Sequence, residues 1–233
     1  MKIGILGGAF DPPHNGHIAL GRAALRELGL EKVLFIPTRV PPHKSVKSGL
    51  SPEMRIYLTL LAVCRIDPSN AGMFAVALRI FTGGSPGLRD FMAQYKLAFL
   101  RGADSQFEVS GIEIAREDGK PSYTYDTVVT LLEKHPEWKP TVIIGTDQAD
   151  TLDTWYRIDE LTKIAEFAVA GRAGFDIETI RRKFPYIKPF EFPPTDISST
   201  MVREHIRNKL SINGLVPPQI EPVLLSRALR NKF

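Results

Sequence analysis

The stretch that decides the fold is residues 2–17, Lys-Ile-Gly-Ile-Leu-Gly-Gly-Ala-Phe-Asp-Pro-Pro-His-Asn-Gly-His. It opens with a short apolar run that is typical of a buried strand, passes through Gly7 and Gly8, and ends in two histidines. A strand, a glycine loop and a helix beginning near His14 would place unpaired backbone N–H groups and the positive end of the helix dipole where an anion binds. His14 and His17 are three residues apart, so within a helix they share a face and can reach one group of phosphate oxygens. The stretch therefore predicts phosphate chemistry at the end of the first strand.

The rest of the chain alternates between helical and strand patterns. A helix is expected over 15–28, ended by Gly29, and a second strand over 32–36, ended by Pro37. Further strands are expected at 107–114, 141–145 and 167–170, and further helices at 125–134, 159–164 and 199–208. This order predicts the α/β class, a Rossmann-like doubly wound parallel sheet. At 233 residues the chain suits a single domain of this kind, over residues 1–233.

Composition limits the classes of substrate and the cellular compartment that the protein is expected to have. The net charge of +4 and the pI near 9.2 are mild, and they suit polyphosphate substrates as well as nucleic acid. With Cys64 as the only cysteine, an intrachain disulfide and a cysteine metal cluster are excluded, which favours a reducing cytoplasm. No apolar run approaches the length that spans a bilayer, and no leader pattern is visible. We therefore expect a cytoplasmic protein with no membrane partner.

The middle of the chain contains an internal repeat. The segment Ser-Pro-Glu-Met-Arg at 51–55 recurs as Ser-Pro-Gly-Leu-Arg at 85–89, and each copy begins an apolar helical pattern with a serine N-cap and a proline at the first position. The segment 74–76 then parallels 107–109. We interpret this as a duplicated helix-strand unit, inserted over about 52–85. A coincidence between two capped helices is the alternative, and an oligomer contact is another role that the sequence leaves open.

Further polar segments are expected at the carboxyl edge of the sheet. Residues 37–44 form a proline-stiffened loop in which Arg39, His43 and Lys44 either face substrate or are solvated. Residues 119–127 are dense in hydroxyls before a helix, and Asp147 ends a buried strand. Residues 196–203 repeat the pattern of hydroxyls at a helix start, with Arg203 one turn later, and predict a second anion site.

Taken in order, these motifs resemble a known enzyme family over nearly the whole chain. They are Gly-Gly-x-Phe-Asp-Pro-x-His-x-Gly-His, Pro-Pro-His-Lys, Ser-Pro-x-x-Arg, Pro-Ser-Tyr-Thr-x-Asp-Thr, Gly-x-Asp with a later Trp, and Ile-Ser-Ser-Thr-x-x-Arg. The order is that of the bacterial nicotinate mononucleotide adenylyltransferases, in the nucleotidyltransferase superfamily. The resemblance implies adenylyl transfer from ATP to nicotinate mononucleotide, giving nicotinate adenine dinucleotide and pyrophosphate, with Mg²⁺ held mainly by the substrate phosphates. The doubled Ser-Pro-x-x-Arg unit departs from the family, which has one, so the copy that takes the family position is left open.

The resemblance also implies a role for individual residues. His14, His17 and Arg203 would be catalytic. The mononucleotide side would be formed by Lys44, Tyr123, Thr124 and Trp155, with Lys44 near the phosphates. No residue is implied as a metal ligand. The residues implied in ATP binding are Gly7, Gly8, Phe10, His14, His17, Asp147, Ile197, Ser199, Thr200 and Arg203.

Two other functions are kept as alternatives. One is an adenylyltransferase or cytidylyltransferase for another phosphate-bearing substrate, against which the Ser-Tyr-Thr segment and Trp155 weigh. The other is a non-catalytic binder of nucleotides or nucleic acid, with the basic residues 181–183 and Lys188 as its footprint. Those residues are more simply a solvated helix face, and the chain carries no recognised nucleic-acid module, so we expect no nucleic-acid partner. A homo-oligomer is left open.

Overall fold

The computed structural model describes residues 1–42, 46–64, 106–116, 118–171, 177–193 and 195–233. Its centre is one parallel sheet of six strands in the order β3-β2-β1-β4-β5-β6. The strands are β1 (Lys2–Gly8), β2 (Lys32–Pro37), β3 (Phe107–Val109), β4 (Lys139–Gly145), β5 (Glu166–Gly171) and β6 (Ile187–Glu191). The order reverses at β1, so a ligand crevice is expected at the carboxyl ends of β1 and β4. The doubly wound class is confirmed.

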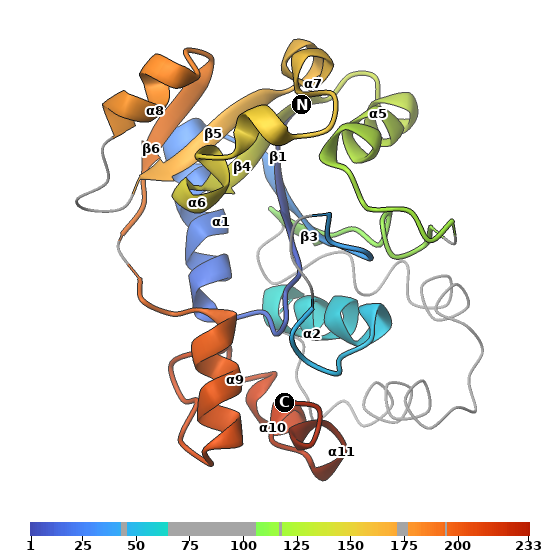
Figure 1. Ribbon diagram of the computed structural model, residues 1–233, viewed down its shortest axis with the longest axis vertical. Coiled ribbons are helices and arrows are strands. Elements are labelled where there is room, and N and C mark those ends of the chain that lie inside the picture. Colours follow the sequence, from blue (N-terminus) through green and yellow to red (C-terminus); the bar gives the residue numbers. More distant parts are fainter. Residues whose placement is uncertain (43–45, 65–105, 117, 172–176, 194) are drawn as a thin grey trace.

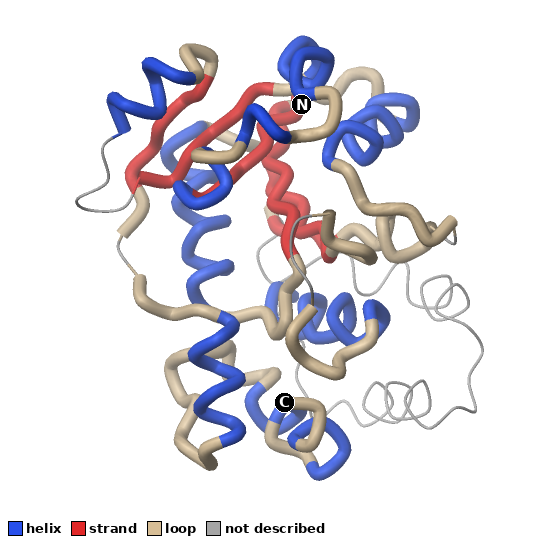
Figure 2. Tube along the Cα trace, in the orientation of Figure 1, coloured by secondary structure: helices blue, strands red, loops and turns tan. Residues whose placement is uncertain are grey.

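Helices cover both faces of this sheet (Figures 1 and 2). One apolar layer packs α1 and α2 against the sheet and continues into α9, α10 and α11, and the other packs α5, α6, α7 and α8 on the opposite face. The helices are α1 (Asn15–Leu28), α2 (Pro52–Cys64), α5 (Thr124–Lys134), α6 (Thr146–Ala149), the 3₁₀ turn η1 (Leu152–Thr154), α7 (Ile158–Ile164), α8 (Ile177–Lys183), α9 (Ser199–Arg207), α10 (Glu221–Leu224) and α11 (Arg227–Arg230).

Strand β1 shows how the sequence supplies both layers. Ile3 and Ile5 enter one apolar layer and Leu6 the other, as the alternation of a strand requires. At Gly4 a Cβ atom would lie 2.7 Å from a methyl group of Ile143 and 2.8 Å from one of Leu30. Any larger residue would displace these methyl groups, because the layer on that face packs directly against the backbone.

The regular elements agree with the sequence in most places. Helix α1 spans the predicted residues, and Gly29 ends it in the left-handed conformation at φ 59°. Strand β3 is shorter than the predicted 107–114, because the chain leaves the sheet after Val109 and forms a turn closed by the bond from Ala115 N–H to the Gly111 carbonyl. Strand β6 was not predicted.

The repeat is only partly within the described residues. Its first copy forms the start of α2, and 107–109 forms β3, which pairs with β2. The second copy at 85–89 and the segment 74–76 lie outside the described residues, as do His43 and Lys44. The single-domain assignment and the insertion over 52–85 stay predictions. None of the described helices has the length and hydropathy needed to cross a membrane.

Candidate active site

The loop between β1 and α1 forms the centre of the site. Phe10 adopts a left-handed backbone conformation, φ 47°, and its buried ring lies 4.8 Å from the His17 ring and 6.1 Å from the Phe35 ring, centroid to centroid. A non-glycine residue with this φ is held by its surroundings, here by aromatic packing. The packing of the Phe10 ring thus fixes the loop that precedes α1.

The two histidines stack on each other at the start of α1. Their ring centroids are 3.7 Å apart, and the His14 backbone N–H donates to His17 Nδ1 at 3.2 Å. Because Nδ1 accepts, a neutral His17 carries its proton on Nε2. Burial lowers the pKa of His14 to about 4, and burial together with the neighbouring His14 holds the pKa of His17 well below 6.5. Both imidazoles are therefore neutral at pH 7.

Close packing around residue 16, between the histidines, explains why it is a glycine. A Cβ atom there would lie 3.0 Å from His14 Nδ1 and 3.3 Å from the Ile197 carbonyl oxygen. Any side chain at this position would push the imidazole or the segment before α9. The same contact shows that residue 197 lies directly beside the start of α1.

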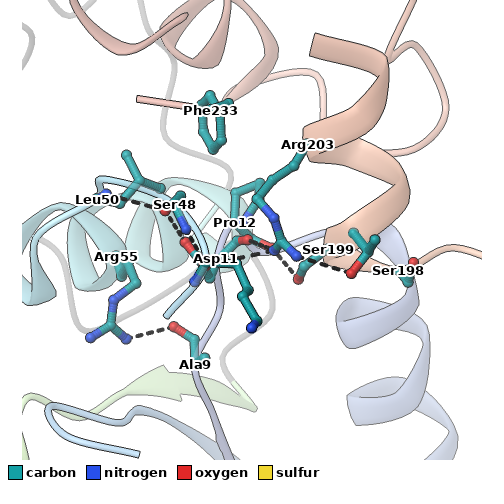
Figure 3. Close-up of polar contacts among 12 residues, drawn as sticks. Ala9, Asp11, Pro12, Ser48, Leu50, Arg55, Ser198, Ser199, Arg203 and Phe233 are labelled. Atoms are coloured by element: carbon teal, nitrogen blue, oxygen red, sulfur yellow. Dashed lines mark hydrogen bonds and ion pairs between the residues drawn. The ribbon is translucent and has the colours of Figure 1, made fainter. Parts of the chain in front are cut away.

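Helix α9 is attached to the same loop (Figure 3). The Ser199 hydroxyl donates to the Pro12 carbonyl at 2.9 Å, and Arg203 Nη1 donates to the Asp11 carbonyl at 2.6 Å. Arg203 Nη2 donates to the Thr200 hydroxyl at 2.9 Å, and Asp11 Oδ2 lies 3.6 Å from Nη1. The two predicted anion sites therefore share one loop instead of lying in separate clefts.

Two buried residues that sequence reasoning did not select hold the loop in place. The Asp11 carboxylate accepts from the backbone N–H groups of Lys47 and Ser48 at 2.9 and 3.1 Å, and also from the Ser48 hydroxyl. Arg55, which is 1% exposed, donates from Nη1 to the carbonyls of Ala9 and Thr38 at 2.6 and 2.7 Å. The available signals were the place of Asp11 in the first motif and of Arg55 in Ser-Pro-x-x-Arg.

A pocket of about 180 Å³ opens beside this loop, at the carboxyl ends of β1 and β4. Of the predicted site residues, it is lined by Gly7, Gly8, Tyr123, Thr124, Asp147 and Trp155. Those gathered around the loop next to it are Phe10, His14, His17, Ile197, Ser199, Thr200 and Arg203. Lys44 lies outside the described residues.

Aromatic residues form one wall of the pocket. The exposed Tyr156, not selected from the sequence, stacks on Tyr123 at 4.5 Å between centroids. Trp155 is half-buried and meets the Phe167 ring edge-on at 6.2 Å. Trp155 thus both packs against the core and borders the pocket.

Glu113 is a further residue of the pocket that was not selected from the sequence. It lies on the turn after β3, is 5% exposed, and accepts a hydrogen bond from the Thr127 hydroxyl at 2.8 Å. Burial raises the pKa of its carboxyl group to about 7. Its apolar neighbours Ile112 and Ile114 made it read as part of a strand, which hid it.

Comparison with known proteins identifies the family. The model of the cytidylyltransferase-like family matches residues 5–205. The nicotinate-nucleotide adenylyltransferase of Bacillus subtilis is 32% identical over 94% of this chain and 93% of its own length. A probable nicotinate-nucleotide adenylyltransferase of Geobacillus thermodenitrificans is 34% identical over 98% of this chain and 85% of its own.

Solved structures show the same fold. A Plasmodium falciparum nicotinic acid mononucleotide adenylyltransferase complexed with NaAD superposes with a TM-score of 0.62 at 19% identity, covering 100% of this chain and 98% of that one. Because the family model spans most of the chain and the bacterial relatives exceed 30% identity over nearly all of it, the chain belongs to the cytidylyltransferase-like family, in its group of nicotinate-nucleotide adenylyltransferases.

Proposed function

We propose that the protein transfers the adenylyl group of ATP to nicotinate mononucleotide and releases pyrophosphate, the step that makes nicotinate adenine dinucleotide for NAD biosynthesis. One observation carries this proposal beyond family membership. The start of α1, the start of α9 and the pocket meet at the loop 9–14, tied together by the Ser199–Pro12 and Arg203–Asp11 hydrogen bonds. A triphosphate and a second nucleotide need such adjoining sites.

The ATP side is assigned to this loop and to α9. Gly7 and Gly8 let the backbone approach the phosphates, since no neighbouring atom fills the space beside Gly7. His14 and His17 would donate to phosphate oxygens, with Ser199, Thr200 and Arg203 on the triphosphate from the other side. Phe10 and Ile197 shape this site, and Asp147 is assigned to the adenosine ribose. Helix α9 brings a Ser198 cap and unpaired N–H groups to the same place.

The mononucleotide side is assigned to the start of α5. Tyr123 is the N-cap of this helix, and its own N–H is bonded to the Pro121 carbonyl. Within the described part of the chain, the backbone N–H groups of Thr124, Tyr125 and Asp126 donate to no carbonyl, as expected in a first helical turn. We assign them to the nicotinate carboxylate, with Tyr123 and Trp155 beside the ring and Lys44 near the phosphates.

The reaction needs positioning and charge neutralisation. A phosphate oxygen of the mononucleotide attacks the α-phosphorus of ATP in line, the new P–O bond forms, and the bond to the bridging oxygen of the leaving pyrophosphate breaks. The attacking phosphate is already ionised, so no general base is required. His17, neutral and protonated on Nε2, donates a hydrogen bond to the growing charge on phosphate oxygens.

Mg²⁺ fits this site as an ion that binds together with the substrate phosphates. Among the described residues, no three His, Cys, Asp or Glu side chains are grouped so that they could hold a metal ion. Asp11 is buried and engaged with Lys47, Ser48 and Arg203. We therefore assign the ion to the substrate phosphates and water, where it offsets the triphosphate charge.

The test is release of pyrophosphate from ATP with a panel of acceptors: nicotinate mononucleotide, nicotinamide mononucleotide and phosphorylated pantetheine. We expect nicotinate mononucleotide to be the preferred acceptor. His17→Ala should lower kcat by roughly 10²- to 10³-fold because a preorganised donor is lost. His135→Ala, at the far end of α5, is the matched control and should keep normal turnover.

Two results would count against the proposal. Preference for phosphorylated pantetheine would replace the proposed acceptor by another phosphate ester while leaving a nucleotidyltransferase. Near-normal turnover by His17→Ala would remove the assigned role of the histidine.

A further inference from the structure

Glu113 is a buried carboxyl group in the pocket to which the proposed mechanism gives no part. Glu113 lies on the turn after β3 and lines the pocket together with Tyr123 and Thr124, the residues assigned to the mononucleotide. Its side chain is 5% exposed. Thr127 donates to Oε1 at 2.8 Å. Oε2 is equally buried and has no well-formed hydrogen bond within the described residues. One carboxyl oxygen thus lies desolvated beside a site that binds a charged ligand.

The group lies where two walls of the pocket meet. Thr38 follows β2, Ser122 precedes α5, and both hydroxyls approach Glu113 closely enough to favour its charged form. Ser122 N–H donates to the Val40 carbonyl at 2.9 Å and joins the two walls directly. The residues that follow Ser122 are those assigned to the nicotinate ring. A change of charge on Glu113 therefore acts on the substrate pocket itself.

The positive groups around Glu113 do not neutralise it. Arg116, on the same turn, pairs with Asp118 at 3.2 Å and lies 3.8 Å from Asp126 of α5. Arg55 of α2 donates to backbone carbonyls and keeps its charge, which attracts Glu113 without forming an ion pair with it. Arg39, after β2, donates to the Ile114 carbonyl. In the described part of the chain, no lysine or arginine nitrogen lies within 4.0 Å of the Glu113 carboxyl. Burial accordingly raises the pKa of Glu113 to about 7, against the opposing effect of the Thr127, Ser122 and Thr38 hydroxyls and of Arg116.

The two mononucleotides differ by one unit of charge. The nicotinate ring carries a carboxylate beside its pyridinium nitrogen, and the nicotinamide ring carries a neutral amide and is therefore net positive. An ionised Glu113 repels the carboxylate of the first and attracts the net positive ring of the second, and a neutral Glu113 does neither. At a carboxyl group that is 5% exposed, such charges are more weakly screened than at the surface.

Resting on the proposed function, we propose that Glu113 sets the preference for the acid over the amide through its protonation. The acid mononucleotide binds to the form in which Glu113 is protonated, and binding draws one proton from solvent onto this carboxyl group. The amide binds without that uptake. Glu113 is a specificity residue that acts through charge.

The test compares wild type with Glu113→Gln, which has the same shape and is always neutral. In wild type, KM for nicotinate mononucleotide should rise from pH 7 to 8.5, by up to about tenfold per pH unit, while KM for the amide does not. Glu113→Gln should show no such rise. Calorimetric titration at pH 7.5 in two buffers of different ionisation enthalpy should show proton uptake with the acid in wild type and none in the variant.

A second variant keeps the proposal testable even if Glu113→Gln does not fold. Thr127→Val removes the hydroxyl that favours the charged form, so the pH at which KM begins to rise should move upward. Thr130→Val is the control, because among the described residues the Thr130 hydroxyl donates to the Asp126 carbonyl of its own helix and to no other group. Its profile should match wild type.

The outcomes separate the two claims. If wild type does not use nicotinate mononucleotide at pH 6.5, the proposed function fails. If it does, and Glu113→Gln keeps the wild-type pH profile and proton uptake, or Thr127→Val leaves the profile unmoved, the function stands and the role of Glu113 is overturned.

Discussion

At the scale of single residues, the site contains two neutral histidines. Charged histidines would bind phosphate more strongly, so their neutrality needs a physical reason. The rings of His14 and His17 stack at 3.7 Å, and two positive charges at that distance would repel each other. Neutral imidazoles still donate one N–H each.

This arrangement predicts a loss of stability in acid. The pKa of His14 is about 4 in the folded protein and 6.5 in the unfolded chain, so the unfolded chain binds more protons between these values. The free energy of unfolding should fall as the pH drops from about 6.5 to 4, by on the order of 3 kcal/mol from His14 alone. Urea denaturation of wild type and His14→Gln at pH 7 and pH 4.5 measures this fall in the free energy of unfolding. The variant should lose less on acidification, and an equal loss would contradict the assigned pKa.

At the scale of elements, the sequence predicted those helices and strands whose bounds are set by residues within the element itself. Helix α1 has a full apolar stripe and a glycine stop, and its bounds were predicted to the residue. Strand β6 was missed because Lys188 and Pro189 break its apolar run, and only the pairing with β5 makes it a strand. Strand β3 was overextended because Ile112 and Ile114 continue the apolar pattern through a turn. Tertiary pairing decided both cases.

Helix α9 gives the element-scale prediction. Arg203 joins it to the loop 9–14 through Nη1, which donates to the Asp11 carbonyl, while Nη2 of the same planar guanidinium donates to the Thr200 hydroxyl of α9 itself. A lysine cannot make both bonds from the same position. Arg203→Lys should lower the unfolding free energy by about 1–3 kcal/mol and reduce kcat/KM for ATP at least tenfold. Arg207→Lys, exposed on the same helix, is the control, and equal behaviour of the two variants would show that α9 is not held in this way.

At the scale of the whole molecule, the site residues divide by how far their partners lie along the chain. The histidine and Ser-Tyr-Thr motifs could be found because their residues are adjacent in sequence. The partners of Asp11, Arg55 and Glu113 are backbone groups or hydroxyls from other segments, such as Ala9, which lies 46 positions before Arg55. The motifs that contain Asp11 and Arg55 therefore gave their places in the sequence but not these contacts. Composition and spacing carry no record of such pairs. They become visible only when the sheet brings the ends of β1 and β2 together.

Arg55 makes this long-range assembly testable. It donates to the carbonyls of Ala9 and Thr38 and, at 3.2 Å, of Arg39, so α2 holds the loops after β1 and β2 through one buried cation. Arg55→Met keeps the volume and removes the donors, which leaves carbonyls buried without partners, at about 1–3 kcal/mol each. Removing the cost of burying a charge offsets part of this, so we expect a net loss of about 3 kcal/mol in urea unfolding. Arg26→Met, exposed on α1, should stay within about 0.5 kcal/mol of wild type. The Arg55 variant should also bind ATP more weakly, because the Ala9 carbonyl it releases belongs to the phosphate loop. Wild-type stability together with wild-type ATP affinity would show that the two loops are held by something other than Arg55.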